Sequence, residues 1–382
     1  MSNYEVAIVG AGIVGCATAY ELARRGVNVC LLDRDSEVSN ATTGLGEGNV
    51  LLSDKRPGPE LELAVHGLAA YDQVEESFGE EAGIRRKGAL VVHLEPAGWR
   101  AEPARIEELQ DAAVECSLLD RDAVRTAEPV LEGEILGGSW FPGDLQCAPR
   151  AIARAMAREA EAHGATVVIG LAGERIALGG GRVKGVTAVG GEGRVSADNV
   201  VVTAGPWSAP LLASAGLGLP LEPRKGQLAR LERRPDFLRH KVIDGSYMGA
   251  VASEDAGLQV STVMETTLDG HVLVGSSRER RGFDLSVDRD LTRLLVDRAA
   301  QLAPELGRLR VDAAWAGLRP WLPGGLPAIG PTELAEGLWV ATGHEGAGIA
   351  YGPITGRLVA QAICGEATDL DLTPFSPDRF AS

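Results

Sequence analysis

The sequence lacks the cysteine and histidine patterns that indicate disulfide frameworks or metal sites. Its five cysteines are scattered along the chain, and no two of them are spaced as CxxC. Its six histidines form neither an HxH nor an HExxH motif. We therefore expect no disulfide framework and no bound metal ion.

Long apolar runs, a signal segment and an excess of positive charge are also missing. No uninterrupted apolar run approaches the length of a transmembrane helix, and the first residues, MSNYEVAIVG, lack the basic region of a signal peptide. The formal net charge of −16 argues against nucleic-acid binding, which needs a cationic surface, and against docking on anionic lipid. We expect a cytoplasmic protein without an integral membrane segment.

What is present is an alternation of strands and helices at the start of the chain. Residues 4–9 predict a strand, and the glycine turn GAGIVG follows it. An alanine-rich helical pattern then runs to about residue 25, and VNVCLLD predicts a second strand that ends at Asp33. This order is typical of a βαβ unit with buried parallel strands.

Later segments predict further helices and a region of antiparallel strands. Helices are expected near residues 60–78, 104–114, 150–164 and 289–301. The strand LWVAT (residues 338–342) is followed by the turn GHEGAGI and by a further helical pattern that runs to about residue 362. The segment from about 220 to 285 shows strands that alternate with turns. We expect a parallel α/β lobe interrupted by an antiparallel β-rich lobe, since 382 residues are many for one compact core.

The segment GAGIVG fits the GxGxxG motif and lies between the first strand and the first helix. Gly10 allows the tight turn, Gly12 lets a pyrophosphate approach the backbone, and Gly15 permits close packing of helix on strand. Asp33, at the end of the next strand, would accept hydrogen bonds from a ribose. The motif indicates a dinucleotide, but it does not decide between NAD and FAD, and a glycine turn without a nucleotide has the same pattern.

Two further glycine turns follow strands and would add walls to the same site. The strand in VVVTAGPWS (residues 200–208) ends near Gly205, and Trp207 lies just beyond it. The segment TGHEGAGIAYGPITG (residues 342–356) is a strand-to-helix turn whose N–H groups would stabilise an anion near Gly348. Together with the N-terminal motif, these turns favour a cofactor site closed by both ends of the chain.

The segment AGLRPWLPGGLPAIGP (residues 316–331) contains a single charged residue, Arg319. Pro320, Pro323 and Pro327 remove backbone donors and fix φ, so the segment cannot form a helix. We expect an ordered turn that presents Arg319 to a site. An arginine that pairs with a carboxylate of the protein, or caps a carbonyl, is the alternative.

These blocks, in this order and spacing, resemble the glycine oxidase, D-amino-acid oxidase and sarcosine oxidase superfamily of FAD-dependent oxidoreductases. The resemblance covers nearly the whole chain and is greatest for the glycine-oxidase-like branch, which includes cyanide synthase subunits and D-hydroxyproline dehydrogenases. It rests on VAIVGAGIVGCATAYELARRGVNVCLLDR, VVVTAGPWS, WAGLRPWLPGGLPAIG and LWVATGHEGAGIAYGPITG. It implies an α/β fold (α+β overall) with an FAD-binding Rossmann-like lobe around a parallel sheet and an antiparallel β-rich substrate lobe.

The resemblance also implies domains that are discontinuous in the sequence. Residues 1–85, 145–218 and 318–382 would form the FAD-binding domain. Residues 86–144 and 219–317 would form the substrate-binding domain.

Carried over residue by residue, the resemblance implies which residues bind noncovalent FAD and substrate. Asp33 and Arg34 would border the adenosine, Thr42 and Thr43 would approach the pyrophosphate and flavin, and Arg319 would bind the substrate carboxylate. The full set expected at the cofactor is Gly10, Ala11, Gly12, Ile13, Val14, Gly15, Asp33, Arg34, Thr42, Thr43, Gly48, Asn49, Gly173, Ala204, Gly205, Trp207, Gly343, His344, Gly346, Ala347, Gly348 and Ile349.

Two positions depart from the family pattern. Gly317 stands where sarcosine oxidases with a covalent flavin have a cysteine, so noncovalent FAD is expected. Gly346 stands where glycine oxidase has an arginine, which puts glycine in doubt as the substrate.

Other polar residues are candidates for the substrate site. Tyr247, in DGSYMGAV, would supply a hydroxyl or a ring wall, although a half-buried strand tyrosine is an equal interpretation. His344 would contact flavin or substrate, or be a plain loop histidine. Met264 and Glu265 are further candidates. RERRG (residues 278–282) is interpreted as a solvated turn, with a docking patch as the alternative.

The reaction implied is FAD-dependent oxidation of the C–N bond of a small amino acid, by hydride transfer from Cα to flavin N5, to give an imine. The substrate would be a D-amino acid, a glycine-like amino acid or a cyclic or N-substituted secondary amino acid. Oxygen or an electron-transfer acceptor would take the electrons, and the protein would act as a homo-oligomer or within a hetero-complex. The alternatives are an FAD-dependent α-hydroxy acid dehydrogenase, with His344 as base, and a flavoprotein subunit of an electron-transferring dehydrogenase complex.

Overall fold

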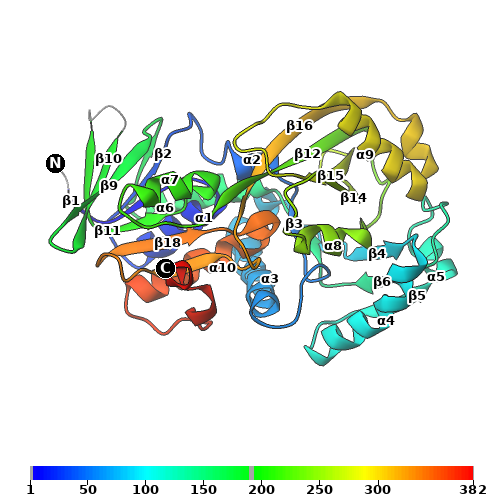
Figure 1. Cartoon of the computed structure of the whole chain (residues 1–382), viewed down its shortest axis with the longest axis horizontal. Coiled ribbons are helices and arrows are strands. Elements are labelled where there is room, and N and C mark those ends of the chain that lie inside the picture. The colour runs from blue at the N-terminus through cyan, green and yellow to red at the C-terminus, as the bar shows by residue number, and fades with distance from the viewer. Residues whose placement is uncertain (1–2, 189–192, 382) are drawn as a thin grey trace.

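The computed structural model describes residues 3–188 and 193–381, and it has a mixed α/β fold built on two eight-stranded sheets. In Figure 1 the strands of the first sheet lie on the left and those of the second sheet on the right. The first sheet is mainly parallel and the second mainly antiparallel. The predicted fold class is therefore confirmed.

The first sheet begins with the predicted βαβ unit. Its central strand, β1, pairs in parallel with β2 on one side and with β11 on the other, and these pair in parallel with β8 and β18. β17 and the hairpin of β9 and β10 are antiparallel additions. The strands are β1 (Asn3–Val9), β2 (Val29–Asp33), β8 (Thr166–Ile169), β9 (Gly173–Gly179), β10 (Arg182–Ala188), β11 (Arg194–Val202), β17 (Ala328–Pro331) and β18 (Leu338–Thr342).

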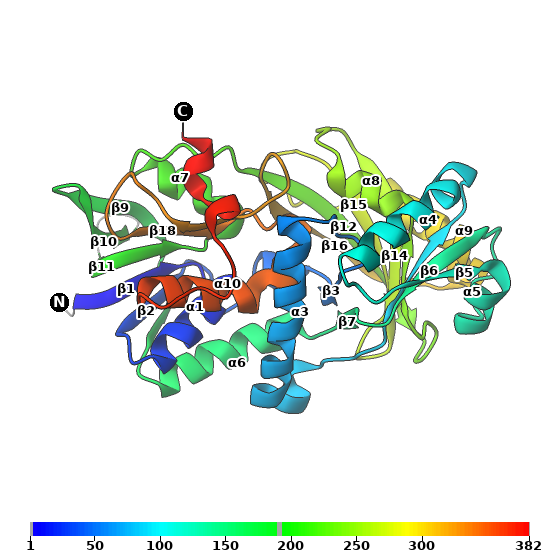
Figure 2. The ribbon, with the colours of Figure 1, turned by 90° about the horizontal axis from the view of Figure 1, so that it is seen from below.

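Several helices pack together beside the first sheet, as Figure 2 shows. α1 packs against α6 and α10, and α10 also packs against α3. The helices of this part are α1 (Ile13–Arg24), α3 (Pro59–Phe78), α6 (Pro149–Ala162), α7 (Ser208–Ala213) and α10 (Gly348–Ile363). Among the residues that the structure describes, no helix combines the length and the apolar character needed to cross a membrane.

α1 and α10 approach each other so closely that α10 needs glycine at the contact. A Cβ at Gly352 would lie 2.9 Å from Ile13 Cγ2, and a Cβ at Gly356 would lie 2.5 Å from the carbonyl carbon of Ala17. Because these contacts advance in the same direction along both helices, the helices run parallel. Their N-termini, at Ile13 and Gly348, therefore point to the same end of the sheet.

The second sheet has the strand order β16-β12-β15-β14-β13-β4-β6-β5 and is antiparallel except for the pair of β4 with β13. α9 packs against β12, β14 and β15, and α8 packs against β14. Its strands are β4 (Ala89–His93), β5 (Ser117–Asp120), β6 (Gly137–Phe141), β12 (Glu222–Arg233), β13 (Lys241–Asp244), β14 (Gln259–Thr266), β15 (His271–Arg278) and β16 (Val311–Trp321). The helices beside it are α4 (Pro96–Asp111), α5 (Arg121–Ala127), α8 (Ser246–Ala252) and α9 (Arg289–Leu302). The short helix α2 (Thr42–Leu45) and a two-stranded sheet of β3 (Asn49–Val50) with β7 (Leu145–Gln146) complete this set of elements.

The predicted turn around Arg319 is wrong, because this residue lies in β16, an edge strand of the second sheet. Pro320 lies opposite Pro223 of β12. Prolines are tolerated at a sheet edge, where a missing N–H costs little pairing. The prolines and glycines of this segment do form a turn, but it begins after Trp321, where β16 ends.

Two other local predictions differ from the structure. α8 lies in a segment predicted as strands, which puts Tyr247 on a helix. The helix predicted to begin near residue 104 begins at Pro96 and continues through Pro103, whose ring lies on the exposed side. The domain boundaries stay a prediction, and the one at residue 318 falls inside β16.

Gly356→Ala is expected to lower the free energy of unfolding by about 1–3 kcal/mol, because the added methyl group overlaps the α1 backbone. Alanine has the higher intrinsic helix propensity, so any loss must come from the contact between the helices. Gly249→Ala in α8 is the matched control, since a Cβ there meets nothing within 4 Å. Urea denaturation followed by circular dichroism checks both variants, and equal effects would contradict the close packing of α1 on α10.

Candidate functional site

A cavity of ≈ 390 Å³ is lined by elements of both large sheets. Its wall includes the glycine turn after β1, the loop after β2, the end of β11, parts of β12 and β16, and the turn before α10. The first residues of α1 and α10, Ile13 and Gly348, both lie at this wall. The parallel packing of these helices therefore brings two N-termini to one cavity.

Most of the residues predicted at the cofactor line this cavity, and so do Arg319 and Tyr247. The predicted cofactor residues that line it are Gly10, Ala11, Gly12, Ile13, Val14, Asp33, Arg34, Thr42, Thr43, Asn49, Gly173, Ala204, Gly205, Trp207, His344, Gly346, Gly348 and Ile349. Four predicted residues are not among the lining residues, and these are Gly15, Gly48, Gly343 and Ala347.

The glycine turn after β1 brings separate parts of the backbone into close contact. Gly10 has a φ of 113°, and a Cβ there would lie 2.6 Å from the carbonyl oxygen of Thr203. A Cβ at Gly15 would lie 1.8 Å from the carbonyl oxygen of Gly10, so this residue shapes the turn from behind the cavity wall. The N–H of Ile13 donates to Thr43 Oγ1 at 3.1 Å. The first N–H groups of an α-helix have no partner within the helix, which suits this turn to a phosphate.

The same part of the cavity carries a carboxylate and a stacked cation. Asp33 Oδ2 accepts a hydrogen bond from Ala11 N at 2.5 Å, and Oδ1 accepts one from Asp35 N at 2.8 Å. Burial raises the pKa of Asp33, although these N–H groups oppose the effect. The Arg34 guanidinium lies 3.8 Å from the centroid of the Trp207 ring. Asp33 has lone pairs left for ribose hydroxyls, and the stacked pair offers a flat surface to an aromatic ring.

Arginines gather at the other end of the cavity, around Arg319. Arg224 and Arg278 are both 1% exposed, and Arg319 Nη1 donates to the carbonyl oxygen of Ser277 at 3.0 Å. Burial lowers the pKa of Arg319, and the neighbouring charge of Arg278 lowers it further. Burial also lowers the pKa of Arg224, to about 10. A guanidinium group keeps its proton in proteins, so all three arginines carry a positive charge at neutral pH.

One carboxylate, Glu345, lies among these arginines. Its Oε1 is 3.5 Å from Arg224 Nη1 and 3.7 Å from Arg278 Nε. Burial raises the pKa of Glu345, but the three arginines outweigh this and hold the pKa below its usual value. Three positive charges and one negative charge leave two positive charges, so this end of the cavity favours an anion.

Arg224, Arg278, Glu345 and Glu47 were not predicted as site residues. The interpretation of RERRG as a solvated turn is wrong for its first residue, because Arg278 ends β15 and lies 4.4 Å from the centroid of the Tyr247 ring. The sequence signal for the burial of Arg278 was the alternation of side chains between the two faces of a strand. Without the pairing of β15 in the sheet, it could not show which face is buried.

His344 is a buried, neutral residue of the turn before α10. It is 4% exposed, and its Nε2 lies 3.1 Å from Thr355 Oγ1. Burial lowers the pKa of His344 to about 3. The ring is therefore neutral throughout the ordinary pH range.

The lining residues fit FAD. The glycine turn, Asp33 and the Arg34–Trp207 pair suit the adenosine and pyrophosphate, and the N-terminus of α10 suits a group that becomes anionic on reduction. The described lining residues include no cysteine, and noncovalent attachment of the FAD stays a prediction. In the part of the chain that the structure describes, no group of three or more His, Cys, Asp or Glu side chains is placed to hold a metal ion.

The free energy of unfolding is expected to decrease as the pH is lowered below about 6.5. His344 stays neutral in the folded protein but takes up a proton in the unfolded chain. The contribution of His344 to stability is complete above the pKa of this residue in the unfolded chain. It is lost progressively as the pH falls towards the pKa of about 3 in the folded protein. The difference in unfolding free energy between wild type and His344→Gln should therefore shrink by about 2 kcal/mol between pH 7.5 and pH 5. Urea denaturation at the two pH values measures it, and a constant difference would show that the ring is not held neutral.

Comparison with known proteins identifies the family of the chain. Residues 5–362 match the family described as FAD dependent oxidoreductase. The chain is 32% identical to glycine oxidase of Pseudomonas putida, over 98% of each chain, and 28% identical to hydrogen cyanide synthase subunit HcnC of Pseudomonas aeruginosa, over 99% of this chain and 96% of the relative. The crystal structure of glycine oxidase from Geobacillus kaustophilus matches it with a TM-score of 0.89 and 26% identity over 100% of both chains. The chain therefore belongs to the family of FAD-dependent oxidoreductases, and its cofactor is FAD.

Proposed function

We propose that this protein oxidises the C–N bond of a small amino acid to an imine, with FAD as the electron acceptor. The observation that carries the proposal is the excess of positive charge around Arg319 at one end of the cavity. An amino acid carboxylate would supply negative charge there and accept paired hydrogen bonds from a guanidinium. The names of the relatives, glycine oxidase in particular, support the same class of substrate.

The residues around Arg319 would orient the substrate. Arg319 would hold its carboxylate, and Tyr247, which is 8% exposed and lines the cavity, would form a wall beside it. Fixing the substrate in this way directs its Cα–H and lowers the entropic cost of reaction. The flavin supplies the acceptor for the hydride. The N-terminus of α10 at Gly348 would favour the negative charge that the cofactor gains.

The substrate proposed is larger than glycine. A Cβ at Gly346 would lie 3.7 Å from Arg319 Cδ, so the absence of a side chain at this position leaves space beside the carboxylate-binding group. A D-amino acid side chain or the ring of a cyclic secondary amino acid would use this space.

An α-hydroxy acid substrate is less well supported. Its oxidation requires a base for the hydroxyl proton. His344 has a pKa of about 3 and its Nε2 is already in contact with Thr355, so it would be a weak base. An amine can lose its proton to water, and amino acid oxidation needs no such residue.

Anaerobic mixing with a panel of D-, L- and N-alkyl amino acids is expected to bleach the flavin absorbance, and D-alanine or D-proline should do so faster than glycine. Lactate and glycolate should leave the absorbance unchanged. If no amino acid reduces the flavin, the proposal is wrong. Hydrogen peroxide formation in air, compared with reduction of an artificial dye, then distinguishes an oxidase from a dehydrogenase that passes electrons to a partner protein.

Arg319→Ala is expected to lower kcat/KM for amino acids by about 100-fold or more, because it removes a charge-assisted pair of hydrogen bonds to the carboxylate. FAD content should stay near that of the wild type. Arg281→Ala is the matched control, since the Arg281 side chain is exposed, and its kcat/KM should not change. Unaltered kinetics of Arg319→Ala would remove this arginine from the substrate site.

A further inference from the structure

We propose that Glu47 is a second substrate-binding residue, whose carboxylate binds the amino group of the amino acid held by Arg319. The inference rests on the proposed function, since it assigns the other charged group of the same zwitterion. It concerns a residue outside the glycine motifs and the arginine segment.

Glu47 lies in the cavity wall with one carboxylate oxygen held by the protein. It follows α2, lines the cavity, and has a side chain that is 10% exposed. Its Oε2 accepts hydrogen bonds from Asn49 Nδ2, at 2.8 Å, and from Lys241 Nζ. A Cβ at Gly275 would lie 3.0 Å from Oε1, so the glycine leaves the space around this oxygen open. Oε1 is therefore the oxygen available to a ligand.

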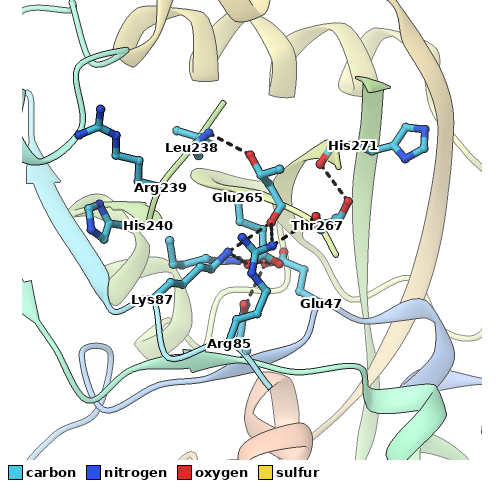
Figure 3. A network of polar contacts seen from close by, with 12 residues as sticks. Glu47, Arg85, Lys87, Leu238, Arg239, His240, Glu265, Thr267 and His271 are labelled. Carbon is cyan, nitrogen blue, oxygen red and sulfur yellow. Dashed lines mark hydrogen bonds and ion pairs between the residues drawn. The ribbon is translucent and has the colours of Figure 1, made fainter. Parts of the chain in front are cut away.

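A buried network of alternating charges extends from Glu47 into the protein, away from the cavity. Beyond Glu47, Lys241 Nζ is 3.7 Å from Glu265 Oε1, and Lys87 Nζ is 3.0 Å from Glu265 Oε2. Figure 3 shows the side chains of Glu47, Lys87 and Glu265 converging. Burial raises the pKa of Glu265, but Lys241 and Lys87 outweigh this and hold it below its usual value. Two lysines and two glutamates balance, so the network itself presents no excess cation to the cavity.

Burying this network of charges is unfavourable, and a ligand-binding role for Glu47 at the cavity would explain why the network is there. Isolated buried charges lose several kcal/mol of hydration each, and apolar residues often replace such networks without loss of stability. Of the two carboxylates near Arg319, Glu345 is already surrounded by arginines. Glu47 lines the cavity, and the hydrogen bonds of its carboxylate involve Oε2 and not Oε1 among the described residues.

Glu47 and Arg319 both lie against β15, at positions two residues apart in the strand. Arg319 Nη1 is bonded to the carbonyl of Ser277, and Glu47 Oε1 lies beside Gly275, two residues earlier in β15. Two residues of chain span at most about 7 Å, so one small ligand could reach both groups. The charge of Glu47 also opposes the lowering of the Arg319 pKa that burial and Arg278 cause, which agrees with their proximity.

The binding of an ammonium group at Glu47 has a consequence for the reaction. Hydride transfer needs the neutral amine, so the bound ammonium must first lose a proton to water. A carboxylate beside the ammonium opposes that loss and raises the pKa of the bound amine. Glu47 would therefore improve binding at neutral pH and make flavin reduction rise with pH.

The test is a comparison of Glu47→Gln with wild-type holoenzyme. Glutamine keeps an acceptor for Lys241 but places an NH₂ group where Oε1 would meet the ammonium. The probes are amino acids and their counterparts without the amino group: glycine and acetate, D-alanine and propionate, and 2-aminoisobutyrate and 2-methylpropanoate. The last pair has no turnover, because 2-aminoisobutyrate has no Cα–H. Dissociation constants come from the change in flavin absorbance, and for reactive amino acids from the concentration dependence of anaerobic reduction.

Glu47→Gln should weaken the binding of amino acids by roughly 10-fold or more, since a charge-assisted hydrogen bond is lost. The amine-free acids should bind as well or better, because a negative charge has left the cavity. Glu336→Gln is the matched control, because Glu336 is an exposed glutamate in the turn before β18. This variant should bind both the amino acids and the amine-free acids as the wild type does. Equal weakening of both classes, or no weakening of the amino acids, would overturn the proposal.

Two further measurements keep the outcome decisive. The pH at which flavin reduction by D-alanine reaches half its maximum should shift downwards in Glu47→Gln, and a merely structural role would leave it in place. If the variant does not retain FAD, the test uses the dissociation constants of the wild type alone. An amino acid that binds the wild type no more tightly than its amine-free counterpart overturns the role of Glu47. If the wild type binds and oxidises no amino acid, the proposed function fails as well, whereas a normal wild type with an unaffected variant disproves only the inference.

Discussion

The parallel contact between α1 and α10 is the constraint on which the site depends. Gly352 and Gly356 let α10 lie directly on Ile13 and Ala17 of α1, although more than 300 residues separate the two helices in the sequence. Because the helices run parallel, their N-termini open into one cavity, where the partial positive charges of both helix dipoles favour phosphate and anionic flavin. A longer side chain at either glycine would separate the two halves of the cofactor site.

The second sheet contributes charge. β12, β15 and β16 carry Arg224, Arg278 and Arg319, and the turn before α10 adds Glu345. The balance of these groups is positive, while the lysine and glutamate network that ends at Glu47 is neutral. The cavity therefore has a cationic end with the carboxylate of Glu47 in its wall, and the proposed amino acid substrate would place one of its two charges at each.

Much of the fold could be predicted from the chain because its signals are local. The βαβ unit, α3, α6, α9 and α10 follow from apolar periodicity and from glycine turns. The strand at Arg319 could not be predicted in this way, because three prolines gave a stronger local signal than the pairing with β12. The same holds for α8, whose short segment lies among strands and packs against β14.

The sequence by itself indicated a dinucleotide cofactor and the residues of the glycine turns, because a GxGxxG turn between strand and helix is typical of dinucleotide binding. It also singled out Arg319 by its isolation among prolines and glycines. Only the tertiary structure decided that Arg278 is buried in the site and not in a solvated turn, and that Glu47 faces the cavity. The reason is that the burial and partners of a charged side chain depend on strands that are distant in sequence, and no local pattern encodes which of them become neighbours.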